Sequence, residues 1–564
     1  MSQIKFFALG GLGDNGKNLY VLEVNGKLII LDAGLQHPTG DFLGVDAIIP
    51  DISYLFTRKD DIQGIFLSHA HDKNIGALPL ILTQIKTKVY GTNFTIEVAR
   101  DFLADNKMNH YDFDFEVVKY NSIIKFDDFA IEYFQTTHSV PLSAGIVIYT
   151  EDGAIVYATD FTFDQNVTTY YKTDFRKLAK IADYGILALL CESNGAGNIG
   201  HSNTNMNLKR IIRRTLTESV GRVIVGMYST ELLNIQIIID EAIKADKKIS
   251  IIGRKAQRLV NIGERMGYIE IPEDKLVNLK FIDNENKNEM NDVVFLVTGE
   301  RHEPFFMLQR MAKGYDRLIH LIESDTILFM CPPLIGTEKI AAKTYDVLCK
   351  LGTKMVKIGK DLLSDFHASS EDIKFMYSIL NPKYIIPING EYRYQLQQYE
   401  IAKEYGYDDS KICLLDNGEV ITFNKGIKEK FHDVIENGTI LIDGSYESDI
   451  NDEVIKEREL LSQDGFLMII ANINAKQHIM LNKPEIVSRG FMFMKENEDM
   501  IKEIEIIYQL ETKKQFAKKN INWKEYKDNF RFQVQRYLYN KSKRKPIVIP
   551  VIIDTDKESV CEII

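Results

Sequence analysis

Cysteine is scarce in this chain, and long apolar runs are missing. The five cysteines are scattered at positions 191, 331, 349, 413 and 561. None belongs to a CxxC pair, which argues against a disulfide framework and against zinc bound by cysteine. No apolar run comes near the roughly 18 residues that a transmembrane helix needs. Residues 1–10 run into a glycine turn without a cleavage site, so we expect a strand and not a signal peptide. These absences favour a cytoplasmic location.

An excess of basic residues is also lacking. The chain has 69 Lys and Arg against 80 Asp and Glu, which gives a net charge of −11. Because nucleic-acid binders usually carry a basic surface, the overall charge weighs mildly against RNA binding. The charge is uneven, however, since residues 513–545 contain twelve Lys and Arg but only two acidic residues. This segment could bind RNA phosphates, and a solvated helix face is an equal alternative.

The apolar pattern predicts an α/β protein of several domains. A length of 564 residues exceeds what one hydrophobic core supports and predicts about three to four domains. Between 205 and 355, long helical periods alternate with buried strands, which is typical of βαβ units. Strands are predicted at 19–24, 27–31, 64–67, 130–134, 248–252, 293–297 and 547–553, and helices at 75–86, 232–243 and 523–540.

The segment 68–76, Ser-His-Ala-His-Asp-Lys-Asn-Ile-Gly, follows a predicted strand and precedes a predicted helix. Two histidines at i and i+2, His69 and His71, can direct both imidazoles at one metal from such a turn. Two incidental histidines in a polar turn would give the same pattern. The spacing alone therefore leaves a metal site and a plain turn equally supported.

Three more polar side chains stand at the ends of predicted strands. They are Asp32 in Leu-Asp-Ala-Gly, His138 in Thr-Thr-His and Asp160 in Ala-Thr-Asp. Loops that carry ligands converge at the carboxyl ends of strands in α/β sheets. Together with the two histidines of 68–76, these residues predict a metal site.

Motifs along the whole chain resemble the ribonuclease J family, which has the metallo-β-lactamase fold with a β-CASP insertion. Among them are Pro-Asp-Ile-Ser-Tyr at 50–54, Thr-His-Ser-Val-Pro at 137–141 and Pro-Ile-Asn-Gly-Glu-Tyr at 387–392. Further similar segments lie at 9–13, 160–165, 265–272, 298–300, 484–491 and 543–550. The resemblance implies a cytoplasmic protein of mRNA turnover and rRNA maturation with 5′-to-3′ exonuclease and endonuclease activity, acting with two zinc ions or with manganese.

The resemblance also implies the domain organisation. We expect an αββα metallo-β-lactamase sandwich in two parts, an inserted α/β β-CASP domain, a linker and a small α+β C-terminal domain. The expected ranges are 1–204 and 356–432 for the sandwich, 205–355 for the insertion, 433–450 for the linker and 451–564 for the last domain.

The metal ligands that the resemblance implies are only partly present. The first site would use His69, His71, His138 and Asp160, all present, with Asp32 supporting them from behind. At the second site, Lys73, Asn74 and Asn389 stand where the family has Asp, His and His. A neutral amide is a weak zinc ligand and an ammonium is none. We therefore expect one zinc or manganese ion at most and an empty second site, where Lys73 could pair with Asp160 in place of a cation.

The β-CASP motifs are altered as well. The resemblance assigns proton handling to Glu192 and phosphate binding to His367 and Ser369. A second histidine of the phosphate-binding segment is missing, and Glu371 stands in its place. That carboxylate would repel an RNA phosphate, or Glu371 simply starts the next helix. Both interpretations leave the general acid absent.

Two functional hypotheses follow. The first is a weak or silent paralogue that binds RNA and partners an active ribonuclease J homologue in a hetero-oligomer, or forms a homodimer, away from any membrane. The second is an active single-metal ribonuclease. Three histidines with Asp160 form a closed four-coordinate site, which is typical of structural zinc, unless Asp160 moves off and opens a position. A hydrolase of small esters or lactams is disfavoured by the resemblance of the insertion to nucleic-acid enzymes.

Overall fold

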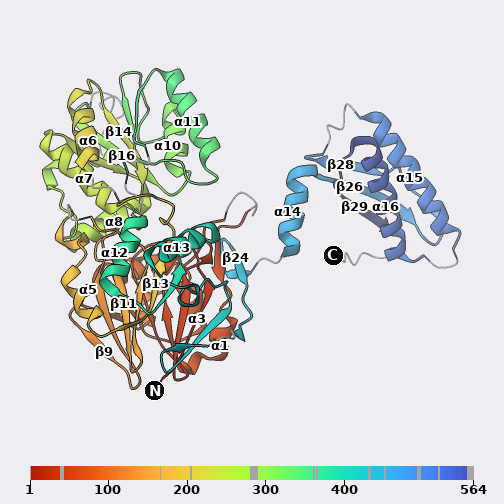
Figure 1. Ribbon diagram of the computed structural model, residues 1–564. Helices are drawn as coiled ribbons and strands as arrows, with labels where there is room; N and C mark the ends of the chain where they lie inside the picture. Colours follow the sequence, from red (N-terminus) through yellow and green to blue (C-terminus); the bar gives the residue numbers. More distant parts are fainter. Residues whose placement is uncertain are drawn as a thin grey trace. The chain divides into compact units, whose positions relative to one another are not determined.

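The computed structural model divides into two compact units (Figure 1), one of residues 1–40 and 45–448 and one of residues 41–44 and 449–564. It describes residues 2–555 apart from 39–43, 165–166, 203–205, 280–289, 360–361, 364–365, 430–432, 450–451, 492–496 and 519–520. None of the described helices is long and apolar enough to cross a membrane.

Two mixed sheets face each other in the first unit. The first has the order β22 (Ile427–Lys428), β21 (Glu419–Asn424), β1 (Gln3–Gly10), β3 (Leu19–Val24), β4 (Lys27–Leu31), β6 (Ile62–Phe66), β7 (Val89–Gly91) and β8 (Phe115–Val117), with β23 (Asp433–Val434) beside β21. The second has the order β19 (Tyr384–Ile388), β13 (Ile186–Glu192), β12 (Gly153–Ala158), β11 (Ala144–Thr150), β10 (Ala130–Gln135) and β9 (Ile123–Lys125). Buried side chains of both sheets, such as Phe6 and Tyr133, share one core between them.

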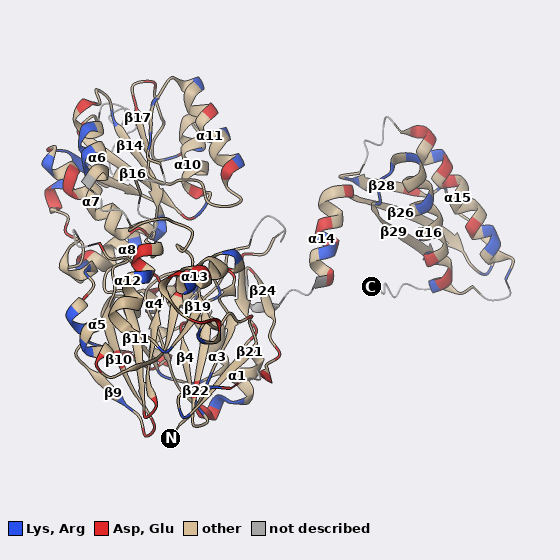
Figure 2. Ribbon diagram, in the orientation of Figure 1, with Lys and Arg blue, Asp and Glu red and all other residues tan. Residues whose placement is uncertain are grey.

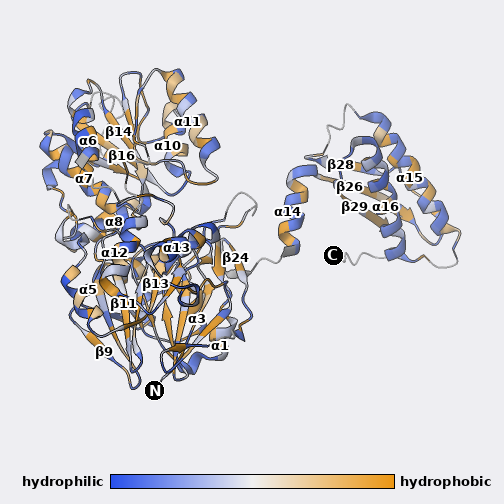
Figure 3. Cartoon of the chain, in the orientation of Figure 1, coloured by the Kyte–Doolittle hydropathy of each residue, from blue (hydrophilic) through white to orange (hydrophobic). Residues whose placement is uncertain are grey.

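Helices cover the outer faces of the two sheets. One core joins the first sheet to α3 (Leu78–Gln84) and α4 (Asn93–Asp105). Another joins the second sheet to α5 (Phe175–Ala182), α12 (Ser370–Leu380) and α13 (Tyr392–Tyr405). The four layers form the αββα sandwich that the sequence predicts, and Figure 3 shows its strands as mainly hydrophobic.

A third, fully parallel sheet is inserted into this sandwich. Its order is β15 (Lys248–Ile252), β16 (Val293–Gly299), β14 (Val223–Tyr228), β17 (Thr326–Phe329) and β18 (Lys354–Lys357). Its two faces are covered by α6 (Met206–Glu218), α7 (Leu232–Lys244) and α8 (Arg254–Arg265) and by α10 (Glu303–Ala312) and α11 (Glu338–Leu351). The central strand β14 is buried along its whole length, as expected for a parallel sheet with helices on both faces. The predicted βαβ pattern is confirmed.

The second unit is a two-layer α/β structure. In its sheet, β26 (Phe466–Asn474) pairs with β27 (Ile479–Met480), β28 (Glu485–Arg489) and β29 (Ile547–Asp554). The helices α15 (Glu498–Phe516) and α16 (Trp523–Ser542) share a core with one face of this sheet. A further helix, α14 (Asp452–Asp464), precedes β26. The predicted final helix and strand are both present.

Two predicted segments differ in detail from the structure. The helix expected at 75–86 is divided into α2 (Asp72–Ile75) and α3, because the chain turns at Gly76 and Pro79 starts a new helix. The range 433–450, expected as a linker, contains β24 (Thr439–Asp443), which pairs with β5 (Ala47–Pro50) and with β25 (Ser445–Asp449). Its polar turns at 437–438 and 443–444 flank this strand. The expected domain ranges remain predictions.

Candidate metal centre

The loop after β6 carries the paired histidines, and its backbone is fixed by the loop after β4. The backbone N–H groups of Ala33 and Leu35 donate to the carbonyl oxygens of Asn74 and Asp72 at 2.7 and 2.9 Å. The N–H of Asn18 donates to the carbonyl oxygen of Lys73 at 3.1 Å. The histidines therefore stand on a loop that neighbouring strand ends hold in place.

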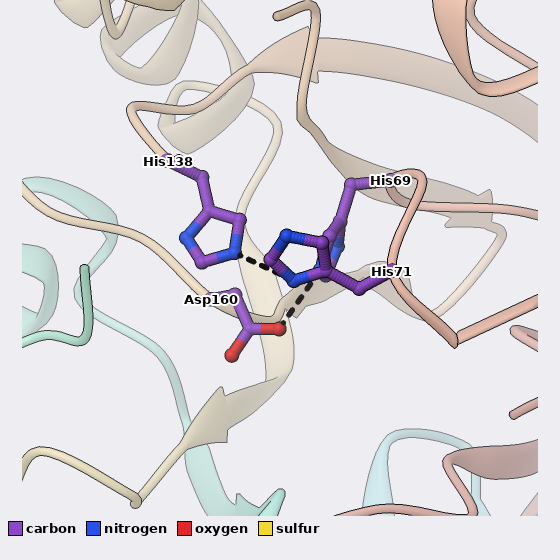
Figure 4. A group of neighbouring side chains, drawn as sticks. All are labelled: His69, His71, His138 and Asp160. Carbon is purple, nitrogen blue, oxygen red and sulfur yellow. Dashed lines mark hydrogen bonds and ion pairs between the residues drawn. The ribbon is translucent and has the colours of Figure 1, made fainter. Parts of the chain in front are cut away.

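Four side chains from three strand ends, those of β6, β10 and β12, converge at this point (Figure 4). The rings of His69, His71 and His138 lie 4.7 to 4.8 Å apart between centroids. The Nε2 of His138 lies 3.3 Å from the Nδ1 of His71, and the Nε2 of His69 lies 3.1 Å from the Oδ2 of Asp160. The ligand atoms of all four residues lie within 4.8 Å of one another. The predicted first ligand set is thus brought together.

This arrangement fits a single metal ion. The Nε2 of His69 and the Oδ2 of Asp160 are buried and face each other at 3.1 Å, and neither atom has another polar partner among the described residues, so a bound ion could satisfy both. Tetrahedral zinc with ligands at about 2.0–2.1 Å places its ligand atoms roughly 3.3 Å apart, close to the separations seen here. Burial and the neighbouring His69 hold the pKa values of His71 and His138 well below the usual range, which favours the neutral, metal-binding imidazole.

The other oxygen of Asp160 has different surroundings. Its Oδ1 lies 2.9 Å from the Nζ of Lys73, 2.8 Å from the Nδ2 of Asn389 and 3.1 Å from the Nδ1 of His367. Burial alone would raise the pKa of Asp160, but the charge of Lys73 and the interactions with His367 and His69 together outweigh it and hold that pKa well below the usual range. The predicted pairing of Lys73 with Asp160 is confirmed. Nitrogen donors occupy this side, so the residues present do not fit a second ion.

Asn74 turns away from the centre and joins Asp32. Its Nδ2 donates to the Oδ2 of Asp32 at 2.6 Å, as do the hydroxyls of Ser68 at 2.7 Å and Tyr157 at 2.6 Å. The Ser68 hydroxyl also lies 2.9 Å from the Nδ1 of His69. Asp32 therefore supports His69 from behind through Ser68. Sequence reasoning missed Ser68 and Tyr157, although Ser68 directly precedes the histidine pair.

The backbone is strained at several of these positions. Asp32, Asp160 and Asn389 each follow a strand and have φ values of 61°, 41° and 47°, and Phe366 has a φ of 58°. Non-glycine residues in this region cost on the order of 1 kcal/mol or more, and such residues cluster at functional sites. Asp and Asn tolerate the conformation better than bulky residues such as Phe366. The strain turns these side chains and the carbonyl of Phe366, which lies 3.0 Å from the Nδ1 of His138, toward the centre.

Glu192 and His367 form a buried ion pair beside Asp160. The Nδ1 of His367 lies 2.6 Å from the Oε2 of Glu192, and the Oε1 of Glu192 accepts from the backbone N–H groups of Phe161 at 2.6 Å and Ala368 at 3.1 Å. Burial opposes protonation of His367, but Glu192 outweighs it and raises the pKa of His367 to about 10. Both carboxylate oxygens of Glu192 are engaged. The proton-handling role of Glu192 stays a prediction.

Ser369 and Glu371 belong to the start of α12. Ser369 caps this helix in a capping box with Asp372 and lines the cleft described below. Glu371 lies in the first turn, and its Oε1 pairs with the Nζ of Lys374 at 3.0 Å. The interpretation that Glu371 starts the next helix is therefore confirmed. Phosphate binding by His367 and Ser369 remains a prediction.

A cleft of about 990 Å³ lies between the sandwich and the inserted sheet. His71, Lys73 and His138 line one wall, and residues at the carboxyl ends of β14 and β16, including Glu231 and Glu300, line the other. Across this cleft, the Nζ of Lys255 from α8 pairs with Asp72 at 2.5 Å and with Glu300. No motif in the sequence pointed to Lys255 or Glu231, and Glu300 belongs to the family-like segment 298–300, to which no role was assigned. These residues are charged surface types by sequence, and only the fold brings them to the cleft.

The fold and the centre define a metallo-β-lactamase-type chain with an inserted parallel domain. Three family models match in agreement with this. The metallo-beta-lactamase superfamily matches residues 12–190, the ribonuclease J beta-CASP domain matches 220–348, and the ribonuclease J C-terminal domain matches 453–555. The likeness therefore reaches the inserted sheet and the second unit as well as the sandwich.

Characterised relatives give the same result over nearly the whole length. Ribonuclease J2 of Bacillus subtilis (strain 168) is 35% identical over 551 residues, covering 98% of each chain. Ribonuclease J 2 of Staphylococcus aureus (strain NCTC 8325 / PS 47) is 34% identical over 553 residues, covering 97% of this chain and 98% of that one. The chain belongs to the ribonuclease J family.

One solved structure supports the fold alone. A crystal structure of a protein of unknown function from Enterococcus faecalis V583 has a TM-score of 0.50 and 13% sequence identity, and the match covers 75% of this chain and 100% of that chain. At this identity the likeness carries no information on activity.

Proposed function

We propose that this chain acts in RNA processing and decay as a ribonuclease J paralogue whose own hydrolytic activity is weak or absent. It binds at most one zinc or manganese ion, through His69, His71, His138 and Asp160. It acts in the cytoplasm as the RNA-binding partner of an active homologue in a hetero-oligomer. The names of the relatives and the match to the ribonuclease J domains support the role in RNA processing.

One observation carries the proposal of weak activity. The Oδ1 of Asp160, which would bridge to a second metal, is held by Lys73 at 2.9 Å and by Asn389 at 2.8 Å. In two-metal hydrolases, the paired ions stabilise both the attacking and the leaving oxygens of phosphodiester cleavage. The ammonium of Lys73 supplies positive charge to Asp160 but has no lone pair with which to bind or activate water. The fold is preserved by this exchange while the two-metal chemistry is lost.

The first half of the centre supports a second candidate, an active single-metal ribonuclease. Three neutral imidazoles and one carboxylate would hold an ion that lowers the pKa of a bound water. The cleft beside this half is open enough to admit a chain, at about 990 Å³. The missing charge of the second ion and the closed ligand set make this candidate the weaker one.

A decay assay separates the two candidates. A 5′-monophosphorylated single-stranded RNA is incubated with the chain and zinc or manganese, alone and beside Asp160→Ala and His69→Ala variants. We expect turnover close to background in all three proteins. Robust turnover that disappears in both variants would overturn the proposal and establish the single-metal enzyme.

The partner role needs its own test. An active ribonuclease J homologue from the same source is mixed with this chain, and complex formation and the decay rate of the same RNA are measured. We expect a stable complex whose rate is unchanged when this chain carries His69→Ala. If no complex forms, or if the variant abolishes the complex's activity, the partner role is wrong.

A further inference from the structure

The carboxyl end of α16 carries a cluster of exposed basic residues with an aromatic residue among them, and Figure 2 colours the lysines and arginines of this helix blue. Its members, which we call the α16 basic face, are Arg536, Tyr539, Lys541, Lys543, Arg544 and Lys545, and all six are exposed. This face is the last part of the basic segment 513–545 that stands out in the sequence. None of the contacts at the metal centre involves it.

The cations of this face differ from three other basic residues of the segment, whereas Lys513, Lys524 and Lys527 also have no ion-pair partner among the described residues. Lys514 pairs with Glu511 at 2.6 Å, Lys518 with Glu525 at 2.8 Å and Arg531 with Asp528 at 3.3 Å. Within the described part of the chain, by contrast, no carboxylate lies within ion-pair distance of the side chains of the five cations on the α16 basic face. Neighbouring like charges without counterions repel each other, and a bound polyanion relieves that repulsion. The face is therefore suited to an anionic partner.

The aromatic residues of α16 make the partner more specific. Phe532, Arg536, Tyr539 and Lys543 follow one another at intervals of four, three and four, which places them along one stripe of the helix. Phe532 and Tyr539 are 60% and 43% exposed. The Nζ atoms of Lys543 and Lys545 lie 5.6 and 5.1 Å from the centroid of the Tyr539 ring. Rings that bases can stack on, flanked by cations for phosphates, are typical of single-strand binding surfaces.

A purely structural explanation accounts for only part of this pattern. Cations near a helix carboxyl end stabilise the helix dipole, which would explain some of the charge. Lys543, however, is the C-cap residue with a φ of 60°, a conformation in which glycine is usual. Capping alone would be served better by glycine, and it requires no exposed rings at positions 532 and 539. Helix capping therefore does not explain the lysine at position 543 or the exposed tyrosine at position 539, and both side chains are accessible to a ligand.

We propose that the α16 basic face binds single-stranded RNA, with its lysines and arginines on the phosphates and Tyr539 stacked on a base. The proposal rests on the proposed function in RNA processing and deepens it, since it places RNA contact outside the metal centre. In the cleft the corresponding cations are engaged with carboxylates: Lys73 with Asp160, and Lys255 with Asp72 and Glu300. The α16 basic face brings together five cations without a carboxylate partner, whereas the described lining of the cleft holds one such lysine or arginine, Arg301, which donates to the carbonyl oxygen of Pro38.

The test measures binding of a fluorescent single-stranded RNA of about 20 nucleotides to the full chain by anisotropy, in EDTA so that no hydrolysis occurs. The variants are Tyr539→Ser, Tyr539→Phe and the double variant Lys543→Gly/Lys545→Gln. The control is Lys514→Gln/Lys518→Gln, which removes the same charge from the same unit but from lysines that are paired.

We expect Tyr539→Ser to weaken binding by about 5- to 100-fold, in line with the loss of one stacked base, and Tyr539→Phe to leave it within about 2-fold. The double variant of the face should lower the slope of log affinity against log salt by about 1.4, or roughly 0.7 for each lost phosphate contact. The control variant should leave both the RNA affinity and the salt slope nearly unchanged. Because glycine suits the cap at 543, the melting temperature of the face variant should not fall.

Three results would overturn the proposal. Unchanged affinity in all variants would mean that the face does not bind RNA, and a protein partner would then be the remaining ligand of this face. Equal losses in the face variant and the control would indicate unspecific charge. Weaker binding together with a lower melting temperature in both Tyr539→Ser and the face variant would indicate a structural role. Failure of the proposed function is distinguishable, because it would appear as metal-dependent turnover in the decay assay and not as a change in binding in EDTA.

Discussion

The two oxygens of Asp160 divide the centre into halves that handle charge in different ways. Around Oδ2 stand His69, His71 and His138, and the ligand atoms of these residues and Asp160 lie within 4.8 Å of one another, as binding of one cation requires. Around Oδ1 stand Lys73, Asn389 and His367, which bring hydrogen-bond donors and positive charge within the chain. If a second metal position is replaced here, as proposed, Lys73 and its neighbours supply the positive charge beside Asp160 that the ion would have supplied.

The exchange follows from the cost of buried charge. A carboxylate that is fully buried, as Asp160 is, must be paired and hydrogen-bonded to remain ionised. A metal ion and an ammonium both meet that requirement, but only the metal can bind water or a phosphate oxygen. Folding and catalysis therefore place different demands on the same position, and under the proposed function the second half of this centre meets only the demand of folding.

Removing a ligand of the first half should have the largest effect. We expect His71→Ala to lower zinc affinity by more than about 100-fold, because a structural or catalytic zinc site depends on each protein ligand. Competition with a chromophoric chelator measures the affinity. His320→Ala, at an exposed histidine that hydrogen-bonds only to a nearby backbone oxygen, is the control and should bind zinc normally. Equal zinc binding by both variants would contradict the proposed first site.

Removing the protein cation of the second half should have the next largest effect. We expect Lys73→Met to reduce the free energy of unfolding by about 2–4 kcal/mol, because Asp160 keeps its charge in a buried place after losing a partner. Added zinc should raise the stability of this variant more than that of the unchanged chain. Lys88→Met, which breaks an exposed pair with Glu116, should cost under about 1 kcal/mol. Chemical denaturation with and without zinc measures these differences, and equal costs at the two positions would show that Lys73 does not replace a cation.

Glu231, on the opposite wall of the cleft, offers a smaller and pH-dependent contrast, because it has no cationic partner among the described residues. Burial raises its pKa from 4.5 to about 7, against a stabilising hydrogen bond from Asn234. The folded chain therefore favours the protonated acid. The contribution of this group to stability is complete below pH of about 4.5 and is lost as the pH rises through about 7.

We expect Glu231→Gln to remove this dependence. Relative to the unchanged chain, the variant should gain about 3 kcal/mol of stability between pH 4.5 and 8, since the pKa is raised by about 2.5 units and each unit corresponds to about 1.4 kcal/mol. Urea unfolding at a series of pH values measures the difference. A difference between the two proteins that stays constant over this range would mean that Glu231 titrates normally.

Much of the first half of the centre could be predicted from the sequence. His69, His71, His138 and Asp160 each follow a strand that the apolar pattern revealed, and strand ends meet at one edge of a sheet. The pairing of Lys73 with Asp160 followed from simple electrostatics, once the resemblance to the family showed which ligands were replaced.

The rest of the site depends on contacts between distant segments. Nothing in the sequence indicated that Asn74 would donate a hydrogen bond to Asp32, since both are polar residues in glycine-flanked turns. Lys255 and Glu300 lie on different elements of the inserted sheet and meet Asp72 only because the chain folds back on itself. The positive φ of Phe366 could not be predicted from the sequence either, because bulky residues rarely adopt this conformation.

The number of metal ions per chain tests the central claim most directly. The unchanged chain and a Lys73→Asp/Asn74→His/Asn389→His variant, which restores the ligand types of the second site, are loaded with zinc, desalted and analysed by elemental mass spectrometry. We predict one tightly held ion in the unchanged chain and two in the variant. Two ions in the unchanged chain would contradict the account, and so would a single ion in a variant that folds and melts normally.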